Sequence, residues 1–187
     1  MWVVGGCYRG HPRIRSDIRN VVGGIMLIKR KVFDKVGAFN GALGRAGSSL
    51  TSCEETEFCL RASAAFPGGR FVFEPDGKVL HKVARGRRSL RYFVRRCYAE
   101  GRSKAILADL ASQHNALDTE RDYVLRILTT GVLIGLADPV RRLDLAGPVR
   151  AGAIVIGLGA AVWGYASSKF RQKSAEQPGS PRLKTAE

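Results

Sequence analysis

The sequence lacks the features that mark several common protein classes. Its four cysteines include no closely spaced pair, and the nearest two, Cys53 and Cys59, lie six residues apart. The paired-cysteine pattern of a zinc ribbon is therefore absent, and we expect small buried thiols in a reducing compartment. Residues 1–6 carry no basic leader and no long apolar stretch, so they do not resemble a targeting signal. We expect a strand there, in a chain that begins inside a domain.

Acidic residues are also scarce, with 16 Asp and Glu against 31 Lys and Arg and a net charge of +15. This balance implies a polyanionic neighbour, which is nucleic acid, anionic lipid or a phosphate-bearing substrate. Charge alone does not choose among them. A length of 187 residues suits one domain plus a tail, and a hydrophobic share of 45% is typical of a globular chain.

After the opening strand, apolar periodicity predicts three helices and three further strands in the first 110 residues. The helices are expected at 31–36, 53–66 and 89–110, and the last of them is long, basic and amphipathic. The strands are expected at 21–28, 71–73 and 79–83. Gly37 stands where a helix C-cap is expected, and residues 75–77 form a turn signal. Residues 8–19 and 40–52 are expected to be loops.

The chain changes character beyond residue 118. Residues 127–137 are uncharged but too short to cross a bilayer, and Asp138-Pro139 is expected to end them. We predict an interfacial segment at 119–148. Residues 151–168 carry no charge and have basic flanks, so we expect a transmembrane helix at 149–168. Residues 169–187 are expected to form a disordered tail.

Three carboxylates, Glu54, Glu55 and Glu57, open the second predicted helix. A structural explanation is available, because acidic residues interact favourably with a helix N-terminus. Two capping boxes are possible, Thr51 with Glu54 and Ser52 with Glu55. Glu57 is also one turn from Arg61, where an ion pair is expected.

Helical geometry separates Glu55 from the other two carboxylates. At about 100° per residue, Glu55 shares a face with Phe58, Cys59, Ala62 and Phe66, whereas Glu54 and Glu57 fall on the flank. An acid aligned with the buried stripe, at the start of a helix and below a Gly-rich loop, is placed to face a cleft. This position favours a general base.

Several segments together resemble a known family in order and spacing. They are residues 23–33, 36–39, 54–61 and 73–75, together with His81. The pattern resembles the second half of the family 2 inverting glycosyltransferases. The resemblance covers roughly residues 1–110. It implies an α/β fold, namely the C-terminal, acceptor-side part of a GT-A nucleotide-diphospho-sugar transferase domain at 1–118, followed by the membrane helix.

The resemblance also implies roles for individual residues. In the family an acidic pair of the Glu-Asp type opens this helix, and its second member is the catalytic base. Here the pair is Glu54 and Glu55, so the resemblance makes Glu55 the base, in place of the usual Asp. His81 matches a metal ligand for Mg or Mn, with a partly buried packing residue as the alternative. Arg95 or Arg96 matches a residue that binds the donor's diphosphate, and a solvated or lipid-facing basic stripe is the alternative.

One departure concerns the family's Asp-x-Asp metal motif, which the sequence does not contain. We therefore expect a fragment without the nucleotide-binding half and without activity of its own. The intact enzyme would transfer a sugar, with inversion, from a nucleotide-sugar donor to a glycan or lipid-linked acceptor. We expect it at the cell membrane, with its catalytic part on the cytoplasmic side.

Two other functions compete with this one. A basic nucleic-acid-binding module would explain the charge and the aromatic residues Tyr92, Phe93 and Tyr98 within the Arg-rich helix. It leaves the uncharged run and the acidic helix start unexplained, so no nucleic-acid partner is expected. A membrane-anchored remnant with a structural role is the third hypothesis.

Overall fold

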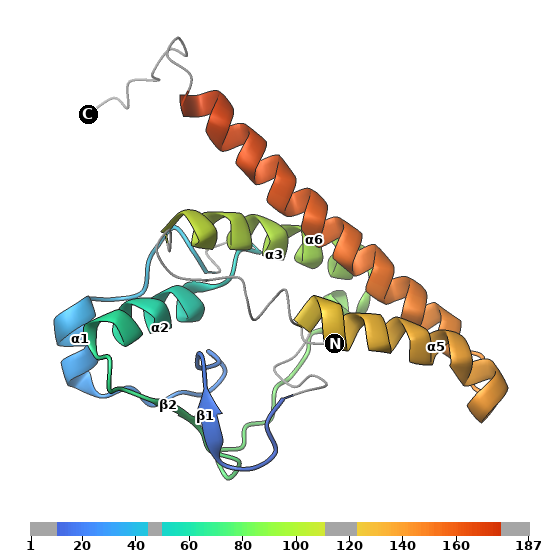
Figure 1. The fold of residues 1–187 in the computed structure, drawn as a ribbon, viewed down its shortest axis with the longest axis horizontal. Coiled ribbons are helices and arrows are strands. Elements are labelled where there is room, and N and C mark those ends of the chain that lie inside the picture. The colour runs from blue at the N-terminus through green and yellow to red at the C-terminus, as the bar shows by residue number, and fades with distance from the viewer. Residues whose placement is uncertain (1–10, 45–49, 111–122, 177–187) are drawn as a thin grey trace.

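The computed structural model describes residues 11–44, 50–110 and 123–176, which form a mostly helical molecule (Figure 1). The strands are β1 (Ser16–Ile18) and β2 (Phe71–Phe73). The helices are α1 (Arg30–Val36), α2 (Glu54–Ala65), α3 (Leu90–Leu110), α5 (Thr129–Arg142) and α6 (Gly147–Glu176). A 3-10 turn, η1 (Arg85–Arg88), precedes α3, and a π-helical turn, η2 (Tyr123–Leu128), precedes α5.

The two strands form a small antiparallel sheet in which Ser16 lies opposite Phe73 and Ile18 opposite Phe71. The strand expected at 71–73 is thus confirmed, whereas the loop expected at 8–19 contains β1. The strands expected at 21–28 and 79–83 are wrong: both segments are irregular, and Leu27 and Leu80 are fully exposed. Neither segment pairs with a strand among the described residues.

The α/β sheet expected of a GT-A domain is consequently not formed by the described residues, and the GT-A architecture stays a prediction. The strand expected at residues 1–6 lies outside the described part of the chain. The turn at 75–77 is confirmed, with the Gly77 N–H donating to the Glu74 carbonyl at 3.2 Å.

The three helices expected in the first 110 residues are confirmed to within one residue at each end. Gly37 follows α1 with a φ of 77°, a conformation that glycine adopts readily. α1 and α2 pack through an aromatic cluster, in which the ring of Phe58, fully buried, lies 4.9 Å from that of Phe33 and 4.8 Å from that of Phe39. This cluster holds the first turns of α2 against the rest of the fold.

The C-terminal helices are longer than the sequence pattern predicts. α5 continues through Asp138-Pro139 to Arg142, so the expected break there is wrong. The buried Asp138 carboxylate is paired with Arg150, 2.7 Å away on α6, which holds the end of α5 in place. α6 continues to Glu176, so the tail expected from residue 169 is helical to that point; residues 177–187 are outside the described part.

α6 packs diagonally across α3 and alongside α5 (Figure 1). Glycines make this approach possible: a Cβ on Gly101 of α3 would clash with the Ala161 carbonyl, and one on Gly164 of α6 would clash with the Tyr98 carbonyl. Tyr98 and Ser167 share a hydrogen bond of 3.0 Å, and Lys169 pairs with Asp109. By length and composition, residues Gly147–Ser174 of α6 are sufficient to cross a membrane.

The cysteines behave as expected where the structure describes them. Cys53, Cys59 and Cys97 are buried. Burial raises the pKa of the Cys97 thiol to about 11, so it stays neutral at physiological pH. Cys7 lies outside the described residues.

Candidate functional site

The acidic start of α2 meets the irregular segment that precedes α1. A Cβ on Gly23 would overlap the Glu55 carboxylate, so only glycine lets this carboxylate approach the backbone there. Gly44, whose φ is 87°, lies beside the Glu54 carboxylate in the same way. A Cβ added to Gly44 would be 3.0 Å from Glu54 Cδ. Each of the two neighbouring carboxylates therefore lies against a glycine, and the two glycines come from different segments of the chain.

Glu55 is half-buried and lacks an ion-pair partner in the described part of the chain. Its pKa is raised above the ordinary value of 4.5, chiefly by burial and further by the negative charge of Glu54. Hydrogen bonds from its own backbone N–H and from that of Gly23 act in the opposite direction. A carboxylate with a raised pKa is a stronger proton acceptor, as a general base requires.

The carboxylate of Glu54 has one unsatisfied oxygen atom. Its Oε2 atom is buried and has no hydrogen-bond partner among the described residues. Such an atom costs free energy unless another group satisfies it. The acidic pair is thus less well satisfied than the buried carboxylates that the structure describes, Glu57, Glu100 and Asp138, each of which has an ion-pair partner.

The residue before the acidic pair is conformationally strained. Cys53 is the N-cap of α2 and has a φ of 75°, in the left-handed region that residues with a Cβ seldom occupy. Neither expected capping box forms, because the Thr51 hydroxyl donates to the Gly44 carbonyl and the Ser52 hydroxyl donates to Glu100. Strained backbone is found at functional sites when surrounding contacts fix it.

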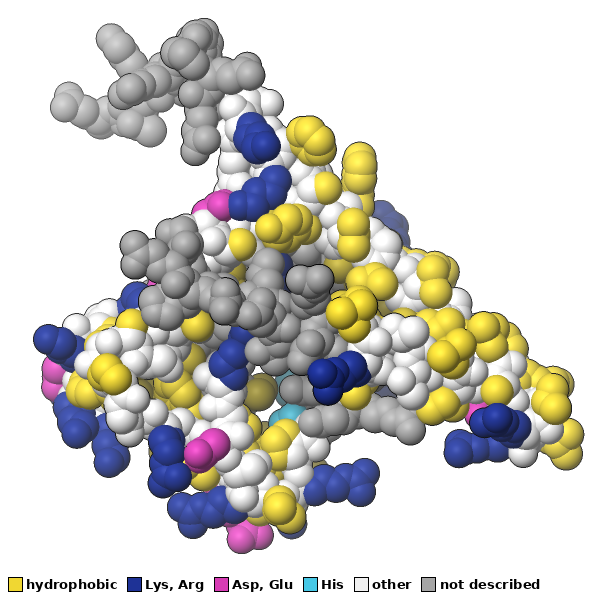
Figure 2. All heavy atoms as spheres, in the orientation of Figure 1, with side chains coloured by type: hydrophobic (Ala, Val, Ile, Leu, Met, Phe, Trp, Pro, Cys, Tyr) yellow, Lys and Arg dark blue, Asp and Glu magenta, His cyan; other side chains and the backbone are white. Residues whose placement is uncertain are grey.

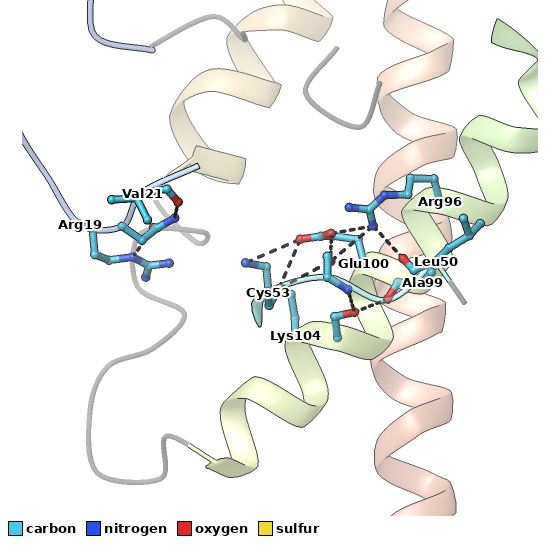
Figure 3. A network of polar contacts seen from close by, with 11 residues as sticks. Arg19, Val21, Leu50, Cys53, Arg96, Ala99, Glu100 and Lys104 are labelled. Atoms are coloured by element: carbon cyan, nitrogen blue, oxygen red, sulfur yellow. Dashed lines mark hydrogen bonds and ion pairs between the residues drawn. The ribbon is translucent and has the colours of Figure 1, made fainter. Parts of the chain in front are cut away.

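A polar network on α3 supplies those contacts (Figure 3). Arg96 Nη1 donates to Glu100 Oε2 at 2.9 Å and to the Leu50 carbonyl at 3.2 Å. The backbone N–H of Ser52 donates to Ser103 Oγ at 2.9 Å. Arg96, Glu100 and Ser103 are all buried. The network therefore anchors the strained segment 50–53 to α3 and fixes the direction in which α2 starts.

Glu57 has a structural role. Its carboxylate is 9% exposed and accepts hydrogen bonds from Arg61 Nε at 2.6 Å and Nη2 at 2.8 Å, which confirms the expected ion pair. Arg61 also donates to the Ala38 carbonyl at 2.9 Å. This bidentate pair connects α2 to the segment after α1.

The other predicted site residues lie apart from the acidic pair. Arg95 is exposed on α3, whereas its neighbour Arg96 is buried in the polar network. His81 is exposed and lines a hollow of roughly 2000 Å³ between the segment before α1 and the β2 region. Val21, Val22 and Gly24 border the same hollow, so this segment adjoins both the hollow and Glu55.

The residues present do not by themselves fit the expected Mg or Mn site. Within residues 11–44, 50–110 and 123–176, no group of three or more His, Cys, Asp and Glu side chains is arranged to hold a metal ion. His81 and the two carboxylates at the start of α2 form no such group. The cation stays an expectation of the family resemblance.

The sequence was compared with known proteins, and one likeness extends over most of the chain. Over 164 residues, 88% of this chain, it is 28% identical to a glucosyl-dolichyl phosphate glucuronosyltransferase of Haloferax volcanii. This match supports a glycosyltransferase family. The chain spans about half of that relative, 51% of its length. No family model and no solved structure matches.

Sequence reasoning identified the acidic helix start but missed the residues that position it. Gly23, Cys53, Glu100 and Ser103 were not singled out. The i, i+4 spacing of Arg96 and Glu100 was a usable signal for an ion pair on α3. The approach of Gly23 to Glu55 had no local signal, because it joins segments that are 32 residues apart, 55 minus 23.

Proposed function

We propose that this chain is the acceptor-side part of an inverting glycosyltransferase of family 2 type with a GT-A domain. Glu55 is its general base, and its acceptor is a lipid-linked or envelope glycan. The observation that carries the proposal is the Glu55 carboxylate itself, half-buried beside a like charge and raised in pKa, at the position where the family resemblance expects the base. The name of the Haloferax relative supports both the reaction class and a lipid-linked acceptor.

The chemistry follows from what a carboxylate in this setting can do. Glu55 takes the proton of an acceptor hydroxyl as the oxygen forms a bond to the anomeric carbon of the donor sugar. The bond from that carbon to the nucleoside diphosphate breaks on the opposite side, and its electron pair leaves with the diphosphate. Attack opposite to the leaving group inverts the anomeric configuration.

Arg95 is the better placed of the two arginines for a donor's diphosphate, because it is exposed while Arg96 is committed to Glu100. A guanidinium at the surface binds phosphate oxygens through paired N–H donors without losing a buried partner. No step is assigned to a metal ion.

Transfer activity tests the proposal. The chain is joined to the part of the Haloferax relative that it does not match, and membranes containing the fusion are given a nucleoside diphosphate glucuronic acid and glucosyl-dolichyl phosphate. We expect labelled glucuronic acid in the lipid fraction, and none from the chain alone. A folded fusion that transfers no sugar from several nucleotide sugars, beside an active Haloferax protein, would overturn the proposal.

A further inference from the structure

α6 has two unlike faces. Small residues face α3: Gly157, Ala161, Gly164 and Ser168 recur at helical spacing, and glycines among them allow the close contact. The opposite face is bulky and apolar. At about 100° per residue, its exposed members fall within an arc of about 120°, a third of the helix circumference. They are Val155, Ile156, Val162, Trp163 and Phe170.

α5 repeats this arrangement on a shorter scale. Gly135 and Asp138 are buried where α5 packs on α6, and the Gly135 and Gly147 backbones approach closely. The other side of α5 carries an apolar stripe at spacings of three and four residues, with side chains that are 58% to 87% exposed. Its members are Leu133, Leu136 and Val140 of the helix and Leu143, the residue that follows its end. Hydrophobic side chains of both helices gather along one edge of the molecule in Figure 2.

The packing of α6 on α3 opposes a membrane crossing. Contacts between the two helices run from Phe93 with Gly157 to Asp109 with Lys169. The α3 part of this contact is about 24 Å long at the rise of an α-helix, most of a hydrocarbon core. If α6 crossed a bilayer, α3 would be carried in beside it with exposed Arg91 and Arg95. Charged side chains at that depth are strongly disfavoured.

We propose that α5 and α6 lie in the plane of an anionic lipid bilayer surface, with their outer apolar stripes inserted among the headgroups and α6 not crossing. Charge complementarity indicates this occupant, since exposed Arg141, Arg171 and Lys173 lie at the ends of the two stripes. Trp163, 67% exposed near the middle of α6, is an aromatic side chain suited to the interface. The proposal does not depend on the proposed transferase activity.

In this arrangement α3 lies between the membrane-facing α6 and the segment that starts α2. The surface would hold the molecule in one orientation, with α3 and the acidic pair on the side away from lipid. A molecule so attached is a peripheral protein held by two helices.

Vesicle binding of the full chain provides the first test. Trp2→Phe leaves Trp163 as the single tryptophan. We expect its emission to shift to the blue on vesicles containing phosphatidylglycerol, with strongest quenching by lipids brominated near the headgroup. Leu136→Glu and Val162→Glu should each weaken binding at least tenfold, since each removes a large apolar side chain from the interface. Ala64→Glu, an exposed position on α2, makes the same charge change away from both stripes and should leave binding unchanged.

The basic residues allow a second, graded measurement. Arg141→Gln and Lys173→Gln should each weaken binding to anionic vesicles roughly fivefold and have little effect on neutral ones. Equal binding to neutral and anionic vesicles by the unsubstituted chain would contradict the role of charge and overturn the proposal.

Topology distinguishes lying from crossing. Thiol reporters at Ala146→Cys, before α6, and Ser174→Cys, in its last turns, are treated with a membrane-impermeant maleimide in sealed vesicles from expressing cells. Labelling of both from the same side supports an in-plane helix. Labelling from opposite sides, or strongest quenching of Trp163 by deeply brominated lipid, would overturn it. Absence of vesicle binding, with a dimer that Val162→Glu dissociates, would overturn it in favour of a second copy.

Discussion

Glu55 and Glu100 lie in neighbouring parts of the fold but in opposite electrostatic settings. Glu100 is buried, accepts a hydrogen bond from Arg96 at 2.9 Å and has Lys104 at 3.8 Å. Glu55 is half-buried beside Glu54, and burial and that like charge raise its pKa. Glu100 is therefore paired with two cations inside the fold, whereas the ionisation of Glu55 is opposed by its surroundings.

Under the proposed function, this difference separates a structural acid from a catalytic one. A buried charge with paired cations contributes to a unique arrangement, and removing one partner is costly. A carboxylate whose ionisation opposes folding needs another reason to be present, and proton transfer is such a reason. The predictions that follow test this division, from the largest expected effect to the smallest.

The largest effect concerns catalysis by Glu55. In the active fusion, Glu55→Gln keeps the shape of the side chain but removes the proton acceptor, so the transfer rate should fall by about 10²–10⁴-fold. Initial rates at saturating donor measure this. Glu57→Gln is the matched control, because Glu57 is paired with Arg61 and should act through stability alone. Normal turnover by Glu55→Gln would remove Glu55 as the base.

Breaking the network on α3 should mainly affect stability. Arg96→Met leaves Glu100 buried with weaker partners, and the free energy of unfolding should fall by about 3–5 kcal/mol. Urea unfolding of the full chain measures the loss. Arg95→Met, at the exposed neighbouring position, should change stability by less than about 0.5 kcal/mol. Equal effects of the two substitutions would show that the network does not hold α3 and the 50–53 segment together.

The approach of Gly23 to Glu55 can be tested separately from proton acceptance. In Gly23→Ala the added methyl group overlaps the carboxylate, which must turn away because it is the flexible end of its side chain. A misplaced base should lower the transfer rate by up to about 10²-fold while the melting temperature changes little. The neighbouring Gly24→Ala, where nothing lies within 4 Å of an added Cβ, is the control. Equal rates for the two variants would mean that the position of Glu55 is not set by Gly23.

A smaller effect on stability is expected at the contact between α3 and α6, where two glycines of α6 can be compared. Gly164→Ala places a methyl group against the Tyr98 backbone, so the helices must separate, at a cost of about 1–3 kcal/mol. Gly159→Ala meets nothing within 4 Å and should stabilise α6 by up to about 1 kcal/mol. Thermal unfolding of both variants in detergent measures the difference. Two effects of the same sign would contradict the packing described here.

The smallest effect is the dependence of stability on pH. The pKa of Glu55 in the folded state lies above 4.5, so the folded state binds the proton of this carboxyl group more tightly than the unfolded state does. The free energy of unfolding therefore falls as the pH rises from the unfolded pKa through the folded pKa. Glu55→Gln removes the penalty, so its melting temperature should exceed that of the parent at pH 7, by roughly 2–4 °C for each kcal/mol removed. The gain should vanish near pH 4. A lower melting temperature for Glu55→Gln at pH 7 would place Glu55 among the structural acids.

The sequence by itself determined the helices of the first 110 residues, because apolar spacing within a helix is a local property. It also singled out Glu55 as the candidate base, which stays a proposal, since the residues that share its helix face are its near neighbours in sequence. The Glu57 and Arg61 pair was accessible for the same reason: both members lie on one helix, one turn apart.

Only the tertiary structure decided the features that join distant segments. The apolar runs at 21–28 and 79–83 suggested strands, but a strand forms only where it pairs with another, and neither run pairs with a strand among the described residues. Ser52 suggested a helix cap, but its hydroxyl donates a hydrogen bond to the carboxylate of Glu100, 48 residues away. The uncharged run of α6 suggested a membrane crossing. Its glycines pack against α3, and that contact determines which face of α6 is left exposed.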